Sequence, residues 1–538
     1  MELTESQQEC REWYHADDTK KTIIGAAGSG KTFLIAQLIA DIQQSDPTAS
    51  IAVSAPTNKA VRVLSEKLDK FELNFLVSKP QSSQISVGTI HKFLMSIPTE
   101  DDEEDESALE FNSEAIENRP YRLYDYIFVD EASMISESLY RLIEESVRGK
   151  LLYIGDPYQL FPVGENRVSY AFRESKNIFY LEGVVRYQGN LLKLASRIRE
   201  RIEDELIEYA YRFGRSKENI EVCKEKCSPE QSNWFANFIQ KALEEVNSDE
   251  YPQPDNLRML VYKKRSLELF SSLIREKVYG EDTKDKYLTG ECLFSHSPFY
   301  AYYNLRQHLE LYELSWLKNR TEQQNNRTKC LLEDRDNNRK RLPNSEDFFV
   351  ENCELDSFTF EKPFGDFYHP TFSKKFDNWE PFTVPFCRVT LTHRDKRHTV
   401  ALLTDKQRII YAHYLQYLVN YWKKYEIPDK FLAKYKSLLN NTFNVKLEYQ
   451  RYNNPQDRLL TFKDGTKVFK VANKVYSSWV ITVHKSQGTT LRDTYFNYTD
   501  CFTRVPGQSN YDSNSNLYRL LYTAVTRTSR DLWVFTKY

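Results

Sequence analysis

The sequence predicts an α/β protein built on two parallel-sheet domains, with two insertions between their strands. Short apolar runs alternate with longer amphipathic stretches in two separate parts of the chain, as expected where helices connect the strands of a parallel sheet. In the first part, a glycine-rich turn directly follows an apolar run and opens a helical stretch. Since 538 residues exceed what one hydrophobic core holds, we expect roughly three or four structural units.

The first α/β pattern extends from Lys20 to Leu160. Four apolar runs in it are read as buried strands, and each is followed by turn residues and an amphipathic stretch. A segment from Ser96 to Pro120, which we call the excursion, interrupts the pattern and contains the acidic run Asp101 to Glu106. An acidic run cannot form a core, so we expect the excursion to project from the domain. The predicted strands are Thr22–Ile24, Ser50–Ala55, Tyr126–Val129 and Lys150–Ile154.

The second α/β pattern is split by a long insertion. It begins with a predicted strand at Arg258–Tyr262 and a helix at Ser266–Val278, and it resumes late in the chain, so we expect both pieces to share one sheet. The region from Glu281 to Phe462 is rich in Pro, Asn and Tyr and lacks the alternation, which favours an inserted domain. The resumed strands are Trp479–Val483 and Leu532–Phe535, and the inserted region contains predicted helices at Asp405–Tyr425 and Pro428–Leu439.

Composition restricts the classes of partner and compartment. The formal net charge of −3 leaves no global basic field, so a nucleic acid would have to be held by a local stripe of Lys and Arg. Aromatic residues make up 14% of the chain, and core packing accounts for them better than stacking on bases. The eight cysteines are scattered, which favours free thiols over disulfides or a metal site. Without a signal sequence or an apolar run of about 18 residues, we expect a cytoplasmic protein with no membrane partner.

A phosphate-binding loop is the strongest motif. The residues Gly25-Ala26-Ala27-Gly28-Ser29-Gly30-Lys31-Thr32 match G-x-x-x-x-G-K-[ST] between a predicted strand and a predicted helix. Glycines let successive backbone N–H groups converge on phosphate oxygens, and the helix N-terminus adds its positive end. We therefore predict that the loop binds ATP, with Lys31 on the β and γ phosphates and the Thr32 hydroxyl on Mg²⁺. A glycine-rich turn with a solvated lysine is the alternative, and the flanking strand and helix argue against it.

Two adjacent acids, Asp130 and Glu131, end the predicted strand Tyr126–Val129. Neighbouring carboxylates repel one another unless a cation lies between them and the phosphates. We assign Asp130 to the Mg²⁺ ion and Glu131 to the attacking water. An isolated Asp-Glu pair is usually a strand end that meets solvent, but this pair lies about a hundred residues after a phosphate loop, which favours the catalytic interpretation.

A second strand end, at Gly155-Asp156-Pro157-Tyr158-Gln159, carries an amide of interest. The Gln159 side chain can donate and accept, which suits a residue that contacts the γ phosphate and reports its loss to a neighbouring domain. A turn amide without a catalytic role fits this segment equally well.

Taken together, these motifs resemble superfamily 1 helicases, in particular the RecD-type branch and its Dda-like bacteriophage members. Three further segments carry the resemblance: Leu3–Gln7, Val480–Gly488 and Leu521–Arg527. The resemblance implies that Gln7 reads the adenine and that Gln487 and Gly488 also contact the nucleotide. It implies that Arg186 and Arg527 reach the γ phosphate as arginine fingers, each worth about 10³ to 10⁵ in rate. Either arginine alone would more often form a surface salt bridge.

The same resemblance implies a set of DNA contacts. Ala55–Lys59 and Thr89–His91 resemble two motifs that touch the DNA backbone, and Tyr262-Lys263-Lys264 replaces the usual Thr-Asn pair, so we expect Lys263 to contact a phosphate instead. The excursion lies where the family places a duplex-splitting hairpin, and we hypothesise that Phe111, its only aromatic residue, packs on the terminal base pair. A ring folded back onto its own domain is the alternative. The remaining implied contacts are Pro56, Thr57, Asn58, Thr89, His91, Phe93, Thr482 and His484.

The resemblance also implies a domain plan. A RecA-like domain 1A would comprise residues 1–95 and 121–185, with a hairpin domain 1B at 96–120. A RecA-like domain 2A would comprise residues 186–280 and 463–538. Domain 2B, an SH3-like β-barrel with a helical extension, would occupy residues 281–462, although residues 300–341 do not match that barrel.

The implied activity is that of an ATP-dependent DNA helicase that translocates 5′ to 3′ on single-stranded DNA and unwinds duplex. One alternative is a nucleic-acid-stimulated ATPase or translocase subunit of a recombination or nuclease complex without intrinsic unwinding. Another is a nucleic-acid-binding scaffold with an inactive ATPase site. The implied partners are single-stranded DNA and duplex junctions, with a single-strand-binding protein or a replisome component as further candidates. The implied form is a monomer in the cytoplasm, that of the host if the chain is phage-encoded, acting in DNA replication or recombination.

Overall fold

The computed structural model describes residues 3–16, 20–73, 75–77, 85–94, 120–203, 215–315, 320–362, 376–426, 429–447, 459–461, 467–501 and 510–536. The chain divides into two compact units, one formed by Met1–Leu267 with Val480–Tyr538 and the other by Glu268–Trp479. The chain therefore passes from one unit to the other twice. Residues 95–119, which include Phe111 and most of the predicted excursion, lie outside the described residues.

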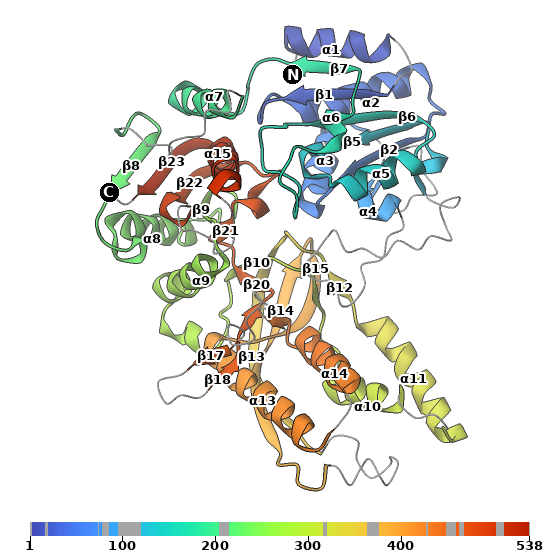
Figure 1. The fold of residues 1–538 in the computed structure, drawn as a ribbon, viewed down its shortest axis with the longest axis vertical. Coiled ribbons are helices and arrows are strands. Elements are labelled where there is room, and N and C mark those ends of the chain that lie inside the picture. Colours follow the sequence, from blue (N-terminus) through green and yellow to red (C-terminus); the bar gives the residue numbers. More distant parts are fainter. Residues whose placement is uncertain are drawn as a thin grey trace. The chain divides into compact units, whose positions relative to one another are not determined.

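The first unit contains a seven-stranded sheet in the order β3-β4-β2-β5-β6-β1-β7, and every neighbouring pair in it is parallel (Figure 1). Helix α1 precedes the first strand, and helices α2 to α6 lie in the connections between strands. The strands are β1 Lys21–Gly25, β2 Ile51–Ala55, β3 Leu76–Val77, β4 Ile85–Thr89, β5 Tyr126–Val129, β6 Lys150–Gly155 and β7 Ile178–Leu181. The helices are α1 Glu5–His15, α2 Lys31–Ser45, α3 Asn58–Lys70, α4 Ile90–Phe93, α5 Glu137–Ser146 and α6 Tyr170–Arg173.

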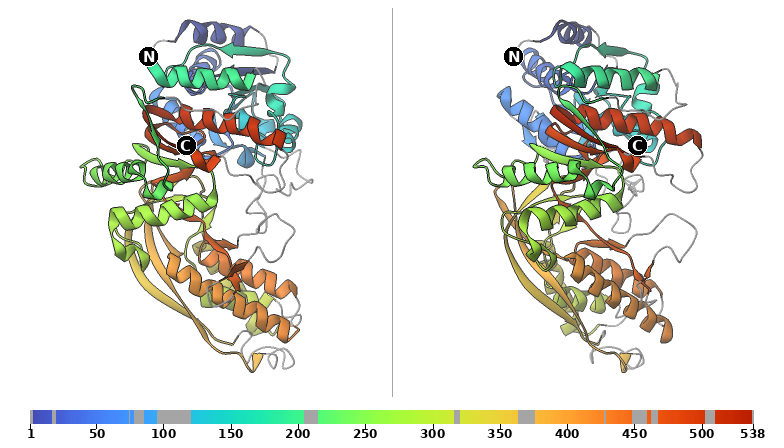
Figure 2. Two further views of the ribbon diagram at one scale, coloured as in Figure 1. Left: turned by 60° about the vertical axis from the view of Figure 1, so that its left-hand side comes forward. Right: turned by 90° about the vertical axis from the view of Figure 1, so that its left-hand side faces the viewer.

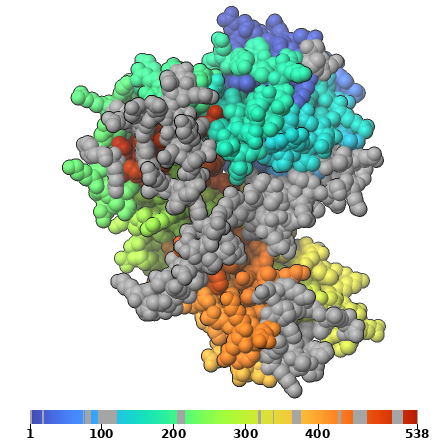
Figure 3. Space-filling view, viewed as in Figure 1, coloured from blue at the N-terminus to red at the C-terminus, as the bar shows by residue number. Residues whose placement is uncertain are grey.

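Helices cover this sheet on both faces, because adjacent residues of its strands enter two different cores. On β5, Phe128 packs with the apolar faces of α2 and α3, whereas Ile127 and Val129 pack with α5 and α6. Side chains alternate along a strand, so a strand buried on both faces reads as a continuous apolar run. In Figure 3, the later residues of the seven-stranded sheet and its helices, coloured blue-green, form much of the visible surface of this part of the first unit.

The first unit also contains a five-stranded parallel sheet in the order β21-β9-β22-β23-β8. Strand β9, which precedes the second unit, pairs with β21 and β22, which follow it, so the expectation that both pieces share one sheet is confirmed. Helices α7 and α15 lie side by side in Figures 1 and 2. The elements are β8 Ile220–Lys224, β9 Leu257–Val261, β21 Val480–Thr482, β22 Leu491–Asn497, β23 Thr528–Thr536, α7 Gly189–Glu203, α8 Asn233–Val246 and α15 Asn510–Arg527. Helix α9 Lys264–Tyr279 begins in this unit and continues into the second.

The second unit is built on a five-stranded antiparallel sheet in the order β15-β14-β13-β10-β20, and its described residues include several longer helices. Its largest strands, β13 Asp347–Phe360 and β14 Phe382–His393, form a long hairpin. The other strands of the sheet are β10 Cys292–Ser295, β15 Lys396–Leu402 and β20 Val475–Ser477. The short strands are β11 Phe299–Tyr300, β12 Arg341–Leu342, β16 Val445–Leu447, β17 Leu459–Thr461, β18 Lys467–Phe469 and β19 Val471–Asn473. The helices are α10 Leu305–Ser315, α11 Glu322–Asn338, α13 Asp405–Lys424 and α14 Asp429–Thr442.

Aromatic side chains dominate the core of this second unit. Phe360 stacks on Tyr414 with ring centroids 4.1 Å apart, and Phe376 stacks on Tyr421 at 5.8 Å. These rings belong to one cluster that also holds Trp379, Trp422 and Tyr435. Much of the high aromatic content of the chain therefore serves packing, as composition indicated.

The described residues contain no disulfide bond, no metal-binding cluster and no helix that could cross a membrane. All eight cysteines are free thiols. Among the described residues, no cluster of three or more His, Cys, Asp and Glu side chains has an arrangement that could hold a metal. None of the described helices has the length and apolar character needed to cross a bilayer.

Candidate functional site

The glycine-rich loop joins β1 to α2 and requires glycine at two positions. Gly28 and Gly30 adopt φ values of 85° and 82°, in the left-handed region that side chains disfavour. A Cβ atom on Gly28 would lie 2.6 Å from Arg186 Cβ, and one on Gly30 would lie 2.4 Å from Gln7 Nε2. The loop thus lies between two residues that the motif analysis assigned to the nucleotide.

Lys31 lies inside this loop at the start of α2. Its Nζ atom donates to the carbonyl oxygens of Gly25 and Ala26, each at 2.9 Å, and the residue is buried. Burial lowers the pKa of Lys31, while the nearby carboxylates of Asp156, Glu131 and Asp130 oppose that shift. The hydrogen bonds that the Lys31 ammonium group makes are to neutral carbonyl oxygens. A ligand with a stronger negative charge could replace them and would bind the ammonium group more strongly.

The acid pair follows β5 directly, beside the first turn of α2. The Thr32 hydroxyl donates to Asp130 Oδ2 at 3.2 Å, and the Glu131 backbone N–H donates to Asp130 Oδ1 at 2.8 Å. Burial, and next the charge of Glu131, raise the pKa of Asp130 to about 6. Glu131 has a φ of 52°, and its buried Oε2 atom has no hydrogen-bond partner in the described part of the chain. The two predicted Mg²⁺ ligands, Thr32 and Asp130, are therefore in contact.

The turn after β6 contributes a residue that the motif analysis did not single out. Asp156 Oδ2 accepts from the Ala27 backbone N–H at 2.7 Å and from the Tyr522 hydroxyl at 2.8 Å. It thereby links the phosphate loop to α15, which packs on the other sheet of this unit. The amide of Ala27, expected to face phosphate, is engaged by this carboxylate. Asp156 stands in the same turn as Gln159, and that proximity was the signal available in the sequence.

Gln159 lies close to α15. Its backbone carbonyl accepts from Arg519 Nη1 at 3.0 Å, and Arg519 also donates to the carbonyl of Pro157. The side-chain Oε1 of Gln159 is buried and has no partner among the described residues. An unpaired buried acceptor is costly, so a ligand that donates to it would be bound favourably.

Arg186 and Arg527 lie in the same cluster of charges. Arg186 Nη1 donates to the Thr526 carbonyl at 3.4 Å, and its backbone N–H donates to the Gly28 carbonyl at 3.2 Å. Burial, and next the positive charge of Arg527, lower the pKa of Arg186 to about 10. Arg527 is 1% exposed, donates to the Thr489 carbonyl at 3.4 Å, and has an Nε atom without a partner among the described residues. Two close guanidinium groups favour a bound anion.

The remaining predicted nucleotide contacts surround the loop. Gln7 Nε2 donates to the Ser29 carbonyl at 3.1 Å, and Gln7 Oε1 accepts from the Thr4 backbone N–H at 3.0 Å. A Cβ atom on Gly488 would lie 3.9 Å from Glu131 Oε1, so this glycine lies near Glu131. Within the described structure, Gln487 Nε2 and Ser29 Oγ are buried without a hydrogen-bond partner.

The predicted DNA contacts of the first sheet gather at one edge. β2 and β4 are parallel neighbours with Ala55 opposite Thr89, so Pro56, Thr57 and Asn58 leave the sheet beside Thr89 and His91. Thr57 caps α3 by accepting from the Ala60 backbone N–H at 3.2 Å. Phe93 differs from its predicted role, because it is 2% exposed and stacks on Tyr121 at 5.0 Å. A ring buried in the core offers no face to a base.

The predicted contacts of the second sheet also share an edge. Thr482 ends β21 and its hydroxyl accepts from the Lys485 backbone N–H at 3.4 Å, while His484 follows it and is exposed. Lys263 follows the neighbouring strand β9, and its backbone N–H donates to Asp500 Oδ2 at 2.7 Å. Sequence reasoning did not identify Asp500.

A buried lysine forms another connection between the sheets of this unit. Lys59 on α3 is 1% exposed, and its Nζ atom lies 3.0 Å from Asp255 Oδ1 in the segment before β9. Lys59 falls within the segment predicted to touch DNA, but this geometry gives it a structural partner.

Comparisons with known proteins give a family match and two kinds of relative. Residues 13–165 match the model of the AAA domain family. The uncharacterized protein R530 of Acanthamoeba polyphaga mimivirus is 27% identical over 294 residues, 52% of this chain and 56% of that protein. The RecBCD enzyme subunit RecD of Buchnera aphidicola subsp. Schizaphis graminum is 32% identical over 152 residues, 27% of this chain and 23% of that subunit.

Among solved structures, the Pif1 helicase from Candida albicans aligns with 100% of this chain and 95% of its own, at 13% identity and a TM-score of 0.40. The chain spans about half the length of the mimivirus protein and about a quarter of the RecD subunit. The resemblance to the RecD-type branch that the motifs indicated is confirmed, and residues 13–165, with the phosphate loop, the acid pair and Gln159, match the AAA domain.

Proposed function

We propose that the chain is an ATP-hydrolysing DNA helicase of the RecD type, which moves along single-stranded DNA. One observation carries this proposal: Arg186 and Arg527 lie in the same charge cluster as the phosphate loop and Glu131. Arg527 ends α15, which packs on the second sheet, whereas the loop and the acid belong to the first. A site divided in this way couples the nucleotide to the relative position of two domains.

The residues present fit MgATP. Lys31 and the N-terminus of α2 would hold the β and γ phosphates, and Gln7, already against the loop at Ser29, would lie near the base. Thr32 and Asp130 would bind Mg²⁺, which when present neutralises phosphate charge and orients the γ phosphate. Glu131 would orient the attacking water through its unpaired Oε2 atom. The unpaired donors of Gln487 and Arg527 support this assignment, because the phosphate oxygens of a bound nucleotide can accept from them.

Motion would follow from the connections between the two sheets. Asp156 joins the Ala27 amide to Tyr522, and Arg519 joins α15 to the turn of Gln159. Loss of the γ phosphate would weaken the hold of both arginines, and these links would transmit the change to α15. Thr57 and His91 on the first sheet, and Thr482 and His484 on the second, would hold the strand in alternation.

The polarity, the unwinding and the partners are finer parts of the proposal. The RecD resemblance supports 5′ to 3′ translocation on single-stranded DNA and action at duplex junctions. A translocase subunit without intrinsic unwinding is the second candidate, and the RecBCD subunit among the relatives favours it. Phe111 as the strand-separating wedge, the domain boundaries of the sequence plan and the barrel of domain 2B remain predictions.

ATP hydrolysis by the purified chain, with and without single-stranded DNA or RNA, tests the proposal. We expect stimulation by single-stranded DNA and loss of turnover in Lys31→Ala. Turnover that Lys31→Ala leaves unchanged would refute the assignment of the site. Strand displacement on duplexes with a 5′ or a 3′ tail then separates the two candidates, because a translocase without unwinding displaces neither strand.

A further inference from the structure

We propose that Tyr262 is a stacking platform for an unpaired nucleobase, within a strand-binding patch formed by Tyr262, Lys263, His484 and Lys485. The inference rests on the proposed function and deepens it, because it assigns to one aromatic side chain a contact with the bases rather than the phosphates. The sequence motifs give Tyr262 no role and predict only a phosphate contact from Lys263.

The two rings of the patch emerge at one edge of the second sheet. Tyr262 directly follows β9, and His484 lies just after β21. These strands are parallel neighbours, with Val261 opposite Thr482, so the residues that follow them leave the sheet side by side. The Tyr262 and His484 ring centroids are 5.9 Å apart, with 25° between the ring planes, which is a stacked arrangement.

A buried carboxylate fixes the backbone that carries Tyr262. Asp500 Oδ2 accepts from the backbone N–H groups of Tyr262 at 2.8 Å and Lys263 at 2.7 Å, and its Oδ1 accepts from the Ser266 hydroxyl at 2.6 Å. Asp500 is 7% exposed. Three hydrogen bonds to one carboxylate hold the turn in place, so the ring needs little ordering when a ligand binds.

The stacked pair is less buried than stacked pairs that serve packing. Phe93 and Tyr121 also stack, but they are 2% and 0% exposed and lie in the core. By contrast, His484 is exposed and Tyr262 is partly exposed. A ring that is only partly buried can make a further contact with another planar group.

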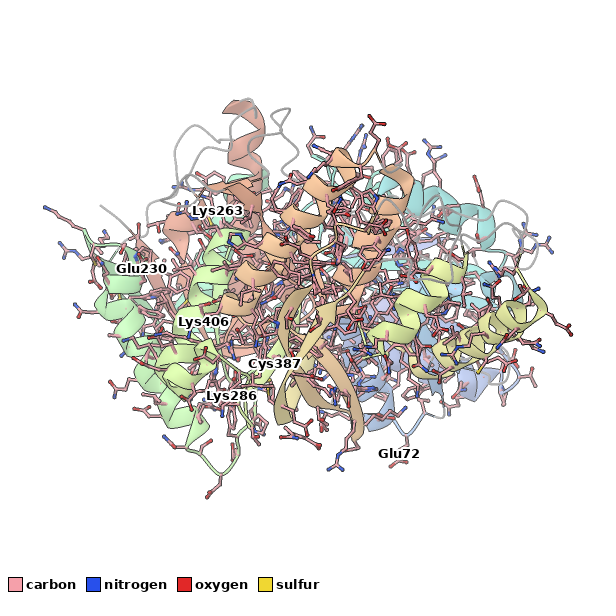
Figure 4. All side chains as sticks on the ribbon, turned by 90° about the horizontal axis from the view of Figure 1, so that it is seen from below. Glu72, Glu230, Lys263, Lys286, Cys387 and Lys406 are labelled. Atoms are coloured by element: carbon pink, nitrogen blue, oxygen red, sulfur yellow. The ribbon has the colours of Figure 1, made fainter. Side chains whose placement is uncertain are left out.

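The charges around the rings select the ligand. Lys263, labelled in Figure 4, and Lys485 are each next in sequence to one of the two rings, and both are partly exposed. Arg265, on the first turn of α9, is exposed. Aromatic faces bordered by cations match the base and phosphate of a single strand, whereas lysine alone would bind phosphate only. Stacking accepts any base, so the contact would carry little sequence preference.

Affinity for two oligonucleotides of equal length tests the inference: an oligothymidylate, and a chain in which abasic tetrahydrofuran units replace the thymidines. Fluorescence anisotropy is measured for the full-length wild type, Tyr262→Ala, Tyr262→Phe and Tyr180→Ala. Tyr180 is a matched control, because it is a tyrosine of the same unit with 62% exposure. Tyr262→Ala should weaken oligothymidylate binding by about 5- to 150-fold, the range for loss of one stacked base. Tyr262→Phe, which keeps the ring, and Tyr180→Ala should bind like the wild type.

The abasic chain separates stacking from a structural effect. Tyr262→Ala should bind it as well as the wild type does. An equal loss for both oligonucleotides, or no loss for either, would overturn the inference while leaving DNA-stimulated hydrolysis, and so the proposed function, intact. If the wild type binds neither oligonucleotide, the proposed function fails together with the inference.

Discussion

Replacement of Asp130 by asparagine should stabilise the ligand-free protein at neutral pH while abolishing ATP hydrolysis. The pKa of Asp130 is raised from an ordinary value of 3.8 to about 6, first by burial and then by the charge of Glu131. The folded state therefore holds the Asp130 proton more tightly than the unfolded state, and ionisation of this carboxyl opposes folding. The resulting penalty is small at acid pH and grows as the pH rises from the unfolded pKa to the folded pKa.

The size of the effect follows from these two pKa values. Ionisation of Asp130 costs the folded state about 1 kcal/mol near pH 4.5 and about 3 kcal/mol near pH 7.5, since one pKa unit corresponds to about 1.4 kcal/mol. The asparagine side chain of the variant would carry no charge at either pH, and its oxygen could still accept from the Glu131 backbone N–H. The gain in the free energy of unfolding should therefore be larger near pH 7.5 by about 2 kcal/mol.

Denaturant unfolding of wild type and Asp130→Asn at both pH values, with a chelator and without nucleotide, measures this difference. Asp69→Asn, an exposed position on α3, is the control and should change stability at neither pH. An equal gain in the free energy of unfolding at both pH values, or a loss of stability near pH 7.5, would show that ionisation of Asp130 does not oppose folding. The same variant should show no ATP turnover, because Mg²⁺ would lose its carboxylate.

The remaining predictions concern contacts between the two sheets of the first unit. Arg527→Ala should lower the ATP turnover number by about 10³-fold or more, with nucleotide affinity little changed. The control Arg530→Ala, at an exposed neighbouring position, should hydrolyse ATP at the wild-type rate. Near-normal turnover by Arg527→Ala would contradict the role of Arg527. Tyr522→Phe removes a hydrogen bond to a carboxylate, so kcat should fall about tenfold with KM for ATP nearly constant; an unchanged kcat argues against transmission through this contact. Lys59→Met should destabilise the fold by about 1 to 3 kcal/mol in denaturant titrations, and additivity with Asp255→Asn would show that the 3.0 Å contact contributes nothing.

Local sequence signals were sufficient for the central strands and for the phosphate loop. The predicted strand Tyr126–Val129 matches β5 residue for residue, because four apolar residues bounded by polar ones leave little freedom of interpretation. Strand β22 was missed, since Arg492 and Asp493 interrupt its apolar run. Arg492 pairs with Glu245 and Asp493 pairs with Arg530. Because these partners are not local in the sequence, no local pattern indicates them.

The candidate site shows the same limit. Lys31 was predicted from a motif within one strand-loop-helix unit, and Asp130 and Glu131 from two adjacent acids that end a later predicted strand. The role of Asp156 depends on Tyr522, which lies 366 positions away in the sequence. Phe93 was assigned to DNA from its place beside a motif, whereas its burial is decided by Tyr121, beyond the excursion. Contacts made by the tertiary fold therefore account for what the sequence could not indicate.

The insertion of the second unit between β9 and β21 has a consequence for the order of folding. These strands pair directly, with Val480 opposite Met259, although the whole second unit separates them in the chain. Closing so long a loop in an unfolded chain costs conformational entropy before any pairing is gained. If the second unit forms its own core first, that core fixes the positions of its two ends. Strands β9 and β21 then have fewer conformations to sample before they pair. The aromatic core around Trp379 and Trp422 would then assist assembly of an ATPase sheet to which it contributes no strand.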